Sequence, residues 1–195
     1  MTSPASPTYP PVLSVVQYPH PVLRKRAEEV TVFNDALRGF CERMFLCMEQ
    51  AKGIGLAAPQ VAVSKRIFIT DHARRDEGQS DRRVWINPRI VNATGASAYE
   101  EGCLSFPGMY ARVERSDRFT VIYQDVYGAE HSLSLDVGAG DFLGVVVQHE
   151  LDHLDGKVFV DHLSDAQLTL IRKRLREMEK DYKKATGKPG VILRR

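Results

Sequence analysis

The sequence predicts an α+β fold in which antiparallel sheets surround one buried helix, with a further helix before and after them along the chain. Three observations carry this prediction. Apolar residues recur at helical spacing from residue 34, strand-like segments fill residues 66–137, and an apolar run at 142–147 continues as a helix. With 195 residues, of which 43% are hydrophobic and 27% charged, the chain is long enough for one well-buried domain, which we expect to span residues 1–195.

The first eleven residues are predicted to form a flexible arm. Four prolines among small polar residues make a composition that buries too little apolar surface to order itself: Pro4, Pro7, Pro10 and Pro11. We expect structure to begin near Val12. In Tyr18-Pro19-His20-Pro21 each proline restricts the residue before it, so the path is extended or turned and His20 is interpreted as a turn residue.

A helix is predicted from Asn34, its N-cap, to a stop at Gly53. Its apolar residues recur at steps of three and four: Leu37, Phe40, Cys41, Met44, Met48 and Ala51. Cys41 and Cys47 are six residues apart and point in different directions on such a helix. We therefore interpret both as packing residues that cannot form a disulfide.

The composition does not indicate a membrane protein. No apolar run approaches the ~20 residues that cross a bilayer, and no basic-then-apolar leader is present. Three cysteines, an odd number, favour a reducing compartment over a disulfide framework. The predicted location is therefore cytoplasmic.

Several antiparallel strands are predicted in the middle of the chain. Residues 66–71 form the first strand, and the polar residues 73–82 form an exposed loop or insertion. Residues 84–86 form a second strand that ends at Asn87-Pro88. Residues 119–137 form the clearest hairpin, turning at Gly128, with leucines and serines alternating in its second half.

The glycine-rich segment Gly53-Ile54-Gly55-Leu56-Ala57-Ala58-Pro59-Gln60 has two interpretations. Its glycines could let the backbone come close to a ligand, or they could simply make a tight connection into the next strand. The glycines alone favour the connection. Gln60 adds a donor and an acceptor on an uncharged amide.

The stretch Gln148-His149-Glu150-Leu151-Asp152-His153 carries the clearest chemistry. Residues four apart on a helix lie one turn above the other, so His149 and His153 can reach a single metal ion. Glu150 would then lie beside the ion without binding it, where a general base can take a proton from an attacking water.

The flanks of this stretch predict a buried helix, with Asp141 as N-cap and Gly156 as stop. The alternative is a surface helix whose two histidines bind nothing. Because the run before the histidines is apolar nearly all round, we favour the buried helix, in which imidazoles need partners.

Candidates for a third ligand differ in strength. Long zinc-peptidase motifs need a histidine six residues after His153, where this chain has Phe159. Glu177 or Glu179 could supply a downstream acid, but both lie in a strongly charged segment that favours solvated glutamates. Cys103 is the better candidate. A lone cysteine is more often a buried hydrophobe, but two histidines without a third partner reverse that preference.

Cys103 lies in the predicted loop Glu101-Gly102-Cys103-Leu104-Ser105-Phe106-Pro107-Gly108, whose path Gly102 and Pro107 fix. A set of one cysteine and two histidines leaves a fourth coordination position open. That arrangement is typical of a catalytic metal site, because a structural site fills all four positions.

Three separated segments together resemble the signature motifs of the bacterial peptide deformylases, in the right order and with similar spacing: Gly53 to Gln60, Glu101 to Ser105 and Gln148 to His153. The likeness runs from about Val12 to Ser164. It implies a peptide-deformylase-like fold around a metal-binding helix. It also implies a metallohydrolase that removes the N-formyl group from the N-terminal formylmethionine of newly made polypeptides and releases formate.

Carried over residue by residue, the resemblance implies three metal ligands, Cys103, His149 and His153, and Glu150 as general base. It implies that the Gln60 side chain and the Leu104 backbone N–H bind the developing oxyanion. One divalent ion per chain is expected, Fe²⁺ in the cell with Zn²⁺, Ni²⁺ or Co²⁺ as substitutes.

Substrate-binding residues are predicted beside the three motifs. The resemblance implies that the Gly55 backbone aligns the peptide, and Gly102 is assigned to the same group. Ile54, Val145 and Val146 are apolar neighbours of the motifs and are assigned to the methionine pocket. Some relatives carry an arginine where this chain has Tyr110, which leaves side-chain preference at the pocket mouth open.

A long helix is predicted over residues 164–186, followed by a basic tail at 187–195. Ser164 and Gln167 form a capping box, and a stripe of apolar residues follows: Leu168, Ile171, Leu175, Met178 and Tyr182. From Arg172 onward ten Lys or Arg face three Asp or Glu, a balance of +7, against 17 basic and 22 acidic residues, or −5, in the remainder. This asymmetry favours contact with the ribosome, although a merely solvated face fits equally well.

Two rival functions remain open from the sequence. A zinc peptidase with the HExxH motif would keep its metal when Cys103 is changed. A non-catalytic metal-binding relative would have no use for Gln60 or Glu150.

Overall fold

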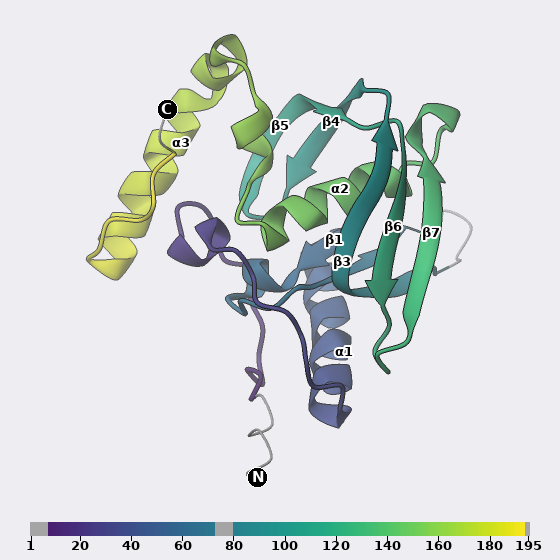
Figure 1. The fold of residues 1–195 in the computed structure, drawn as a ribbon. Helices are drawn as coiled ribbons and strands as arrows, with labels where there is room; N and C mark the ends of the chain where they lie inside the picture. Colours follow the sequence, from purple (N-terminus) through teal and green to yellow (C-terminus); the bar gives the residue numbers. More distant parts are fainter. Residues whose placement is uncertain (1–7, 73–79, 194–195) are drawn as a thin grey trace.

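A computed structural model of the chain describes residues 8–72 and 80–193 (Figure 1). The predicted α+β class is confirmed, because helices pack on two separate antiparallel sheets. The predicted loop residues 73–79 and the prolines at positions 4 and 7 lie outside the described residues. Within the described part, no helix is both long and apolar enough to cross a membrane.

The larger sheet has five strands in the order β1-β2-β3-β6-β7, each antiparallel to its neighbour. Its strands are β1 (Gly55–Ala57), β2 (Ile67–Asp71), β3 (Arg82–Thr94), β6 (Arg118–Gln124) and β7 (Glu130–Asp136). The smaller sheet is the hairpin of β4 (Ser97–Cys103) and β5 (Phe106–Arg115). Because β1 lies at the end of its sheet and β4 pairs only with β5, each has one free edge among the described strands.

Three α-helices in the described residues complete the fold: α1 (Asp35–Gln50), α2 (Leu143–Leu154) and α3 (Asp165–Thr186). Short 3₁₀ turns join the larger elements: η1 (Pro21–Arg24), η2 (Ala58–Val61), η4 (Val137–Ala139) and η5 (Phe159–His162). Figure 1 shows α2 in the centre, between the β4–β5 hairpin and the larger sheet, whereas α3 lies at the outer edge.

The central position of α2 follows from its sequence. Apart from Leu151, every one of its residues is buried, as the apolar run predicts. Gly144 permits this packing, because a Cβ at that position would collide with the Val137 side chain. Gly156, in a left-handed conformation at φ +72°, ends the helix as predicted.

The predicted N-cap of α2 is wrong. Phe142, not Asp141, occupies that position, and no side chain caps the helix. The Gly144 and Val145 N–H groups donate instead to the carbonyls of Asp141 and Phe142, each at 3.0 Å. A 3₁₀ turn thus provides the acceptors that a cap would supply.

The helix α1 begins as predicted, with the Asn34 side chain accepting from the Leu37 N–H. It ends at Gln50, three residues before the predicted stop. Cys41 and Cys47 are free and buried, as predicted. Tyr9, inside the predicted arm, stacks on Phe40 at 4.4 Å between ring centroids, because an aromatic ring buries enough apolar surface to be held.

The largest error concerns strands. The second predicted strand does not end at Asn87-Pro88 but continues as β3 to Thr94, because the pairing with β6 skips these residues in a bulge. A proline fits there without losing a ladder hydrogen bond. The β4–β5 hairpin was not predicted, so Cys103 lies at the end of a strand rather than in an irregular loop.

Candidate metal centre

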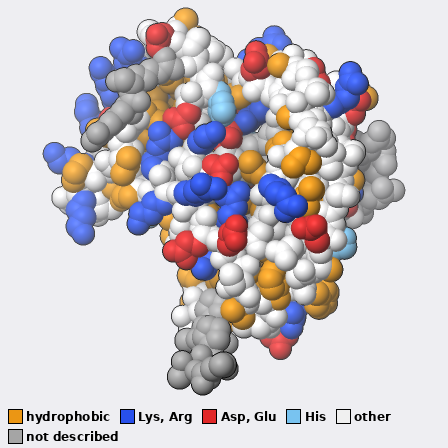
Figure 2. All heavy atoms as spheres, in the orientation of Figure 1, with side chains coloured by type: hydrophobic (Ala, Val, Ile, Leu, Met, Phe, Trp, Pro, Cys, Tyr) orange, Lys and Arg blue, Asp and Glu red, His pale blue; other side chains and the backbone are white. Residues whose placement is uncertain are grey.

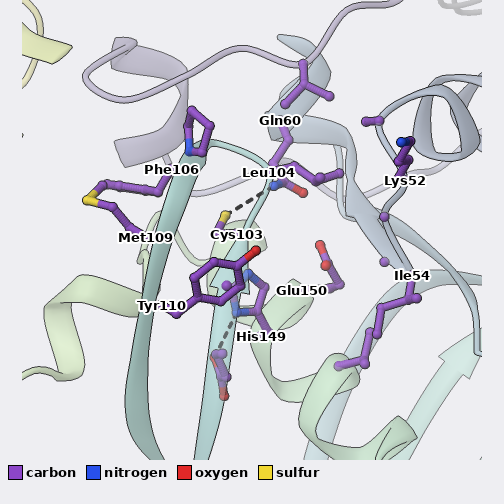
Figure 3. A pocket seen from close by; sticks show the side chains of 18 of the residues that line it. Lys52, Ile54, Gln60, Cys103, Leu104, Phe106, Met109, Tyr110, His149 and Glu150 are labelled. Carbon is purple, nitrogen blue, oxygen red and sulfur yellow. Dashed lines mark hydrogen bonds and ion pairs between the residues drawn. The ribbon is translucent and has the colours of Figure 1, made fainter. Parts of the chain in front are cut away.

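Three predicted ligands converge although they come from distant parts of the chain. Cys103 ends β4, and His149 and His153 lie one turn apart on α2. Their candidate ligand atoms all lie within 4.8 Å of one another, and Cys103 Sγ is 3.3 Å from His153 Nε2. Figure 3 shows Cys103, His149 and Glu150 directed toward one common space.

His149 is oriented by a buried carboxylate. Its Nδ1 lies 2.8 Å from Glu101 Oε2, so a proton on Nδ1 is donated to Glu101 and Nε2 is left for a metal. Burial works to lower the pKa of His149, but Cys103 and Glu101 outweigh it and raise the pKa well above 6.5. Positive charge is therefore favoured at this position.

His153 has the opposite environment. It is completely buried, and burial lowers its pKa well below 6.5, so the neutral imidazole that binds metals is the stable form. Its Nε2 faces the sulfur of Cys103. The two histidines thus differ in electrostatics although they share one helix face.

Glu150 lies beside the three ligand atoms without a strong partner of its own. Only 4% of the residue is exposed, and Oε2 has no hydrogen-bond partner among the described residues. Burial raises its pKa to about 7. Gly55 makes room for this carboxylate, because a Cβ there would lie 2.5 Å from Glu150 Oε1.

These residues fit one divalent ion. A thiolate and two imidazoles are donors that suit iron or zinc, and the set supplies three ligands with a fourth position left for a reactant. The preference for positive charge at His149 and the unpartnered oxygen of Glu150 also favour a bound cation. In the part of the chain that the structure describes, this is the one Cys/His/Asp/Glu group with metal-binding geometry.

A cavity of about 630 Å³ opens onto this centre. All five predicted substrate-binding residues line it, as do Gln60 and Leu104: Ile54, Gly55, Gly102, Val145 and Val146. Gln60 is fixed by the Ala57 N–H, which donates to Oε1 at 2.8 Å. Its amide nitrogen is thereby held 3.5 Å from Cys103 Sγ (Figure 3).

The sequence matches proteins of one known family. The family model of the polypeptide deformylases matches residues 12–169. A peptide deformylase of Stenotrophomonas maltophilia (strain K279a) is 42% identical over 172 residues, which are 87% of this chain and 97% of that protein. The chain belongs to the peptide deformylase family.

Solved structures agree with this assignment. The crystal structure of plant peptide deformylase PDF1B has a TM-score of 0.89 at 33% identity, covering 96% of this chain and 100% of that one. A peptide deformylase from Plasmodium falciparum has a TM-score of 0.80 at 40% identity, covering 89% and 99%. The chain is therefore a metal-dependent enzyme with deformylase activity toward N-formylmethionyl peptides, and the rival functions are not favoured.

Two glutamates considered as peptidase ligands lie outside the deformylase centre. Glu177 pairs with Arg174 on α3 at 3.4 Å, and Glu179 accepts from the Tyr18 hydroxyl at 2.6 Å. Neither belongs to the group of converging ligand atoms. Changing Glu177 is therefore a suitable control for changes at the centre.

The sequence did not reveal the residues that support this centre. Arg115 donates to both oxygens of Glu101 at 2.6 and 2.9 Å, and to Asp152 at 2.6 Å. Burial works to raise the pKa of Asp152, but His162 and Arg115 lower it to about 2. Recognising β4 as a strand would have placed Glu101 on the face of Cys103, two residues away.

The mouth of the cavity carries Tyr110, the residue for which the sequence left side-chain preference open. Tyr110 is 67% exposed and lines the opening. Its ring lies against Gly102, where a Cβ would come within 2.6 Å of the Tyr110 side chain. This glycine is thus needed for the tyrosine to lie flat on the hairpin.

Proposed function

We propose that Cys103, His149 and His153 hold one divalent ion. In this proposal Glu150 is the general base in the hydrolysis that releases the formyl group. The convergence of the three ligand atoms within 4.8 Å, beside a buried carboxylate, carries this proposal. A bound ion would supply Lewis-acid chemistry, which polarises the formyl carbonyl and acidifies water.

Glu150 moves the proton in this scheme. It takes a proton from water as the water oxygen bonds to the formyl carbon, and it returns this proton to the amine nitrogen as the carbon–nitrogen bond breaks. Formate and a free N-terminus leave. Its buried position supports the role, because burial raises the pKa of the carboxyl toward neutrality, and such a group can both accept and return a proton.

Gln60 and Leu104 are proposed to bind the charge that develops on the formyl oxygen. The Gln60 amide nitrogen is held beside Cys103, and Leu104 follows Cys103 in the chain, so its backbone N–H originates next to the centre. Donors fixed in advance are worth roughly 3 kcal/mol each to the transition state.

The free edges of β1 and β4 are proposed to hold the substrate backbone. Gly55 lies on β1 and Gly102 on β4, and both line the cavity, where an extended peptide can add as a strand. Ile54, Val145 and Val146 supply apolar surface for the methionine side chain. In this proposal the substrate N-terminus points toward Glu150.

The proposed ion in the cell is Fe²⁺, with Zn²⁺, Ni²⁺ or Co²⁺ able to replace it. The cysteine and two histidines in the ligand set support iron or zinc over the hard cations Mg²⁺ and Ca²⁺. A thiolate ligand also makes an iron form sensitive to oxidation. Assays under anaerobic conditions are therefore needed.

Formate release from a formyl-Met tripeptide, measured anaerobically with and without a chelator, tests the proposal. We expect activity in wild-type protein, loss on chelation, and loss of turnover with retained metal in Glu150→Gln. Glu177→Gln, the matched control, should behave as wild type. Full activity of Glu150→Gln, or bound metal that survives Cys103→Ala unchanged, would contradict the assigned roles.

Contact of α3 with the ribosome is a second proposal. Figure 2 shows Lys and Arg side chains at the left of the view, where Figure 1 places α3. The cations of this helix are all exposed: Arg172, Lys173, Arg174, Arg176, Lys180, Lys183 and Lys184. Such a surface supports binding to RNA, with a cytoplasmic location for the enzyme. Co-sedimentation with ribosomes should weaken as salt rises, and binding insensitive to salt would argue against it.

A further inference from the structure

A series of hydrogen-bonded side chains leads from the proposed metal centre to the protein surface. His149 contacts Glu101 at 2.8 Å, and Glu101 receives two hydrogen bonds from Arg115. Arg115 Nη1 donates to Asp152 Oδ2 at 2.6 Å, and the same oxygen lies 2.8 Å from His162 Nε2. A candidate ligand on α2 is thereby connected to a side chain on η5.

The members of this series become more exposed toward its outer end. The exposed side-chain fraction is 3% for Glu101, 4% for Arg115, 12% for Asp152 and 31% for His162. Buried charges of this kind depend on each other, because removing one partner leaves the next one unpaired. His162 is the member that can be changed with the least disturbance of packing.

The position of His162 is itself fixed. On the same 3₁₀ turn, Phe159 is buried and its ring stacks on that of His149, 6.3 Å between centroids. Arg24 donates to both oxygens of Asp161, at 2.5 and 3.1 Å. The His162 ring is therefore presented to Asp152 by a well-anchored turn.

One carboxylate oxygen, Asp152 Oδ2, accepts hydrogen bonds from two donors. Arg115 approaches it from the hairpin and His162 from η5. With only one of these donors, the carboxylate could rotate and carry the Arg115 guanidinium with it. Because Arg115 is bidentate to Glu101, such a shift would reach the carboxylate that orients His149.

We infer that His162 is a positioning residue of the metal centre, which acts through Asp152, Arg115 and Glu101 to fix the orientation of His149. The inference rests on the proposed metal site and adds a residue to it that lies outside the three deformylase motifs. It assigns no contact with substrate to His162, which does not line the cavity.

Metal retention by full-length protein tests this inference. Zinc-loaded wild type and His162→Phe are titrated with a chelator, and bound zinc is measured by atomic emission. We expect His162→Phe to release zinc at roughly 3- to 10-fold lower chelator concentration, since changes to such supporting residues weaken metal affinity by about 10- to 100-fold when they touch the ligand directly.

Further variants separate hydrogen bonding from packing. His162→Gln retains an N–H near the position of Nε2 and should hold zinc as wild type does. His162→Ala removes the donor without added bulk and should match His162→Phe. His131→Phe is the matched control, because His131 also contacts a carboxylate, Asp125 at 2.9 Å, but on the distant β6–β7 hairpin.

The outcomes are distinguishable. Zinc retention in both His162→Phe and His162→Ala equal to wild type would overturn the inference while leaving the metal site intact. Equal losses in His162→Gln and His162→Ala would overturn it as well, because the hydrogen bond would then be irrelevant. A wild-type protein that binds no zinc would overturn the proposed metal centre, and this inference with it.

Discussion

The burial of Glu150 determines the pH range in which the proposed general base can act. Burial raises its pKa to about 7, and a cation bound beside it lowers that value, so the carboxylate form is lost as pH falls through a point below 7. We expect kcat/KM for a formyl-Met peptide to decline on the acid side with one protonation. In Glu150→Asp the midpoint should move, and an unmoved midpoint would assign this protonation to another group.

The three cysteines should differ in reactivity. Burial raises the pKa of Cys41 to about 12 and also raises that of Cys47, whereas Cys103 is only partly buried. Because the thiolate is the reactive form, iodoacetamide at about pH 8 should label Cys103 alone in native metal-free protein. Peptide mapping checks this, with denatured protein as the control that labels all three. Native labelling of Cys41 would contradict it.

At the residue scale, the sequence predicted three candidate ligands that the structure brings together, and it missed the residues that Glu101 links to them by hydrogen bonds. His149 and His153 follow from helix spacing, and Cys103 from the lack of another ligand. Arg115 and His162 are 34 and 13 residues before and after His149, and no periodicity links such positions. Only the folded chain brings them together around Asp152.

At the scale of single helices, replacing a glycine by alanine should have opposite effects on protein stability in α1 and α2. Gly39 lies within α1, and a Cβ there meets only the flexible end of Arg43 at 3.4 Å. Gly39→Ala should stabilise the protein by up to about 1 kcal/mol. Gly144→Ala should destabilise it by about 1–3 kcal/mol, because the added methyl group collides with Val137. Urea unfolding of both variants checks this, and equal signs would contradict it.

Elements with a continuous apolar pattern were predicted well. The helices α1, α2 and α3 each show such a pattern, and the Ser164–Gln167 capping box forms as predicted. The β4–β5 hairpin was missed because Glu101 and Arg115 are buried charges within it. From sequence alone, a charged residue in a strand is interpreted as exposed. The burial of Glu101 and Arg115 is tolerated only because the two side chains pair with each other.

At the scale of the whole molecule, a bound ion should add a further link between the β4–β5 hairpin and α2, which Glu101–His149 and Arg115–Asp152 already connect. Cys103 belongs to the hairpin, whereas both histidines belong to α2. A ligand at 100 times its Kd stabilises the folded state by about 2.7 kcal/mol. Calorimetry should show a higher Tm with zinc in wild type and in Cys47→Ala but not in Cys103→Ala. A zinc-dependent shift that survives Cys103→Ala would contradict the proposed ligand set.

The overall architecture could be predicted only as far as the family resemblance and local patterns reach. The α+β class and the central helix were confirmed. More than one antiparallel sheet was predicted, but the assignment of strands to sheets was not, because strand order depends on long-range pairing such as β3 with β6. The single-domain interpretation of residues 1–195 stays a prediction.

The burial of the proposed metal ligand His153 and the proposed general base Glu150 limits when a substrate can be processed. His153 is fully buried and Glu150 nearly so, and each residue of an extended peptide advances only about 3.3–3.6 Å. The N-terminus of a substrate can therefore reach these groups only if its first few residues are unfolded. Deformylation must therefore compete with the folding of each new protein. A substrate whose first residues become buried early is no longer accessible to the enzyme.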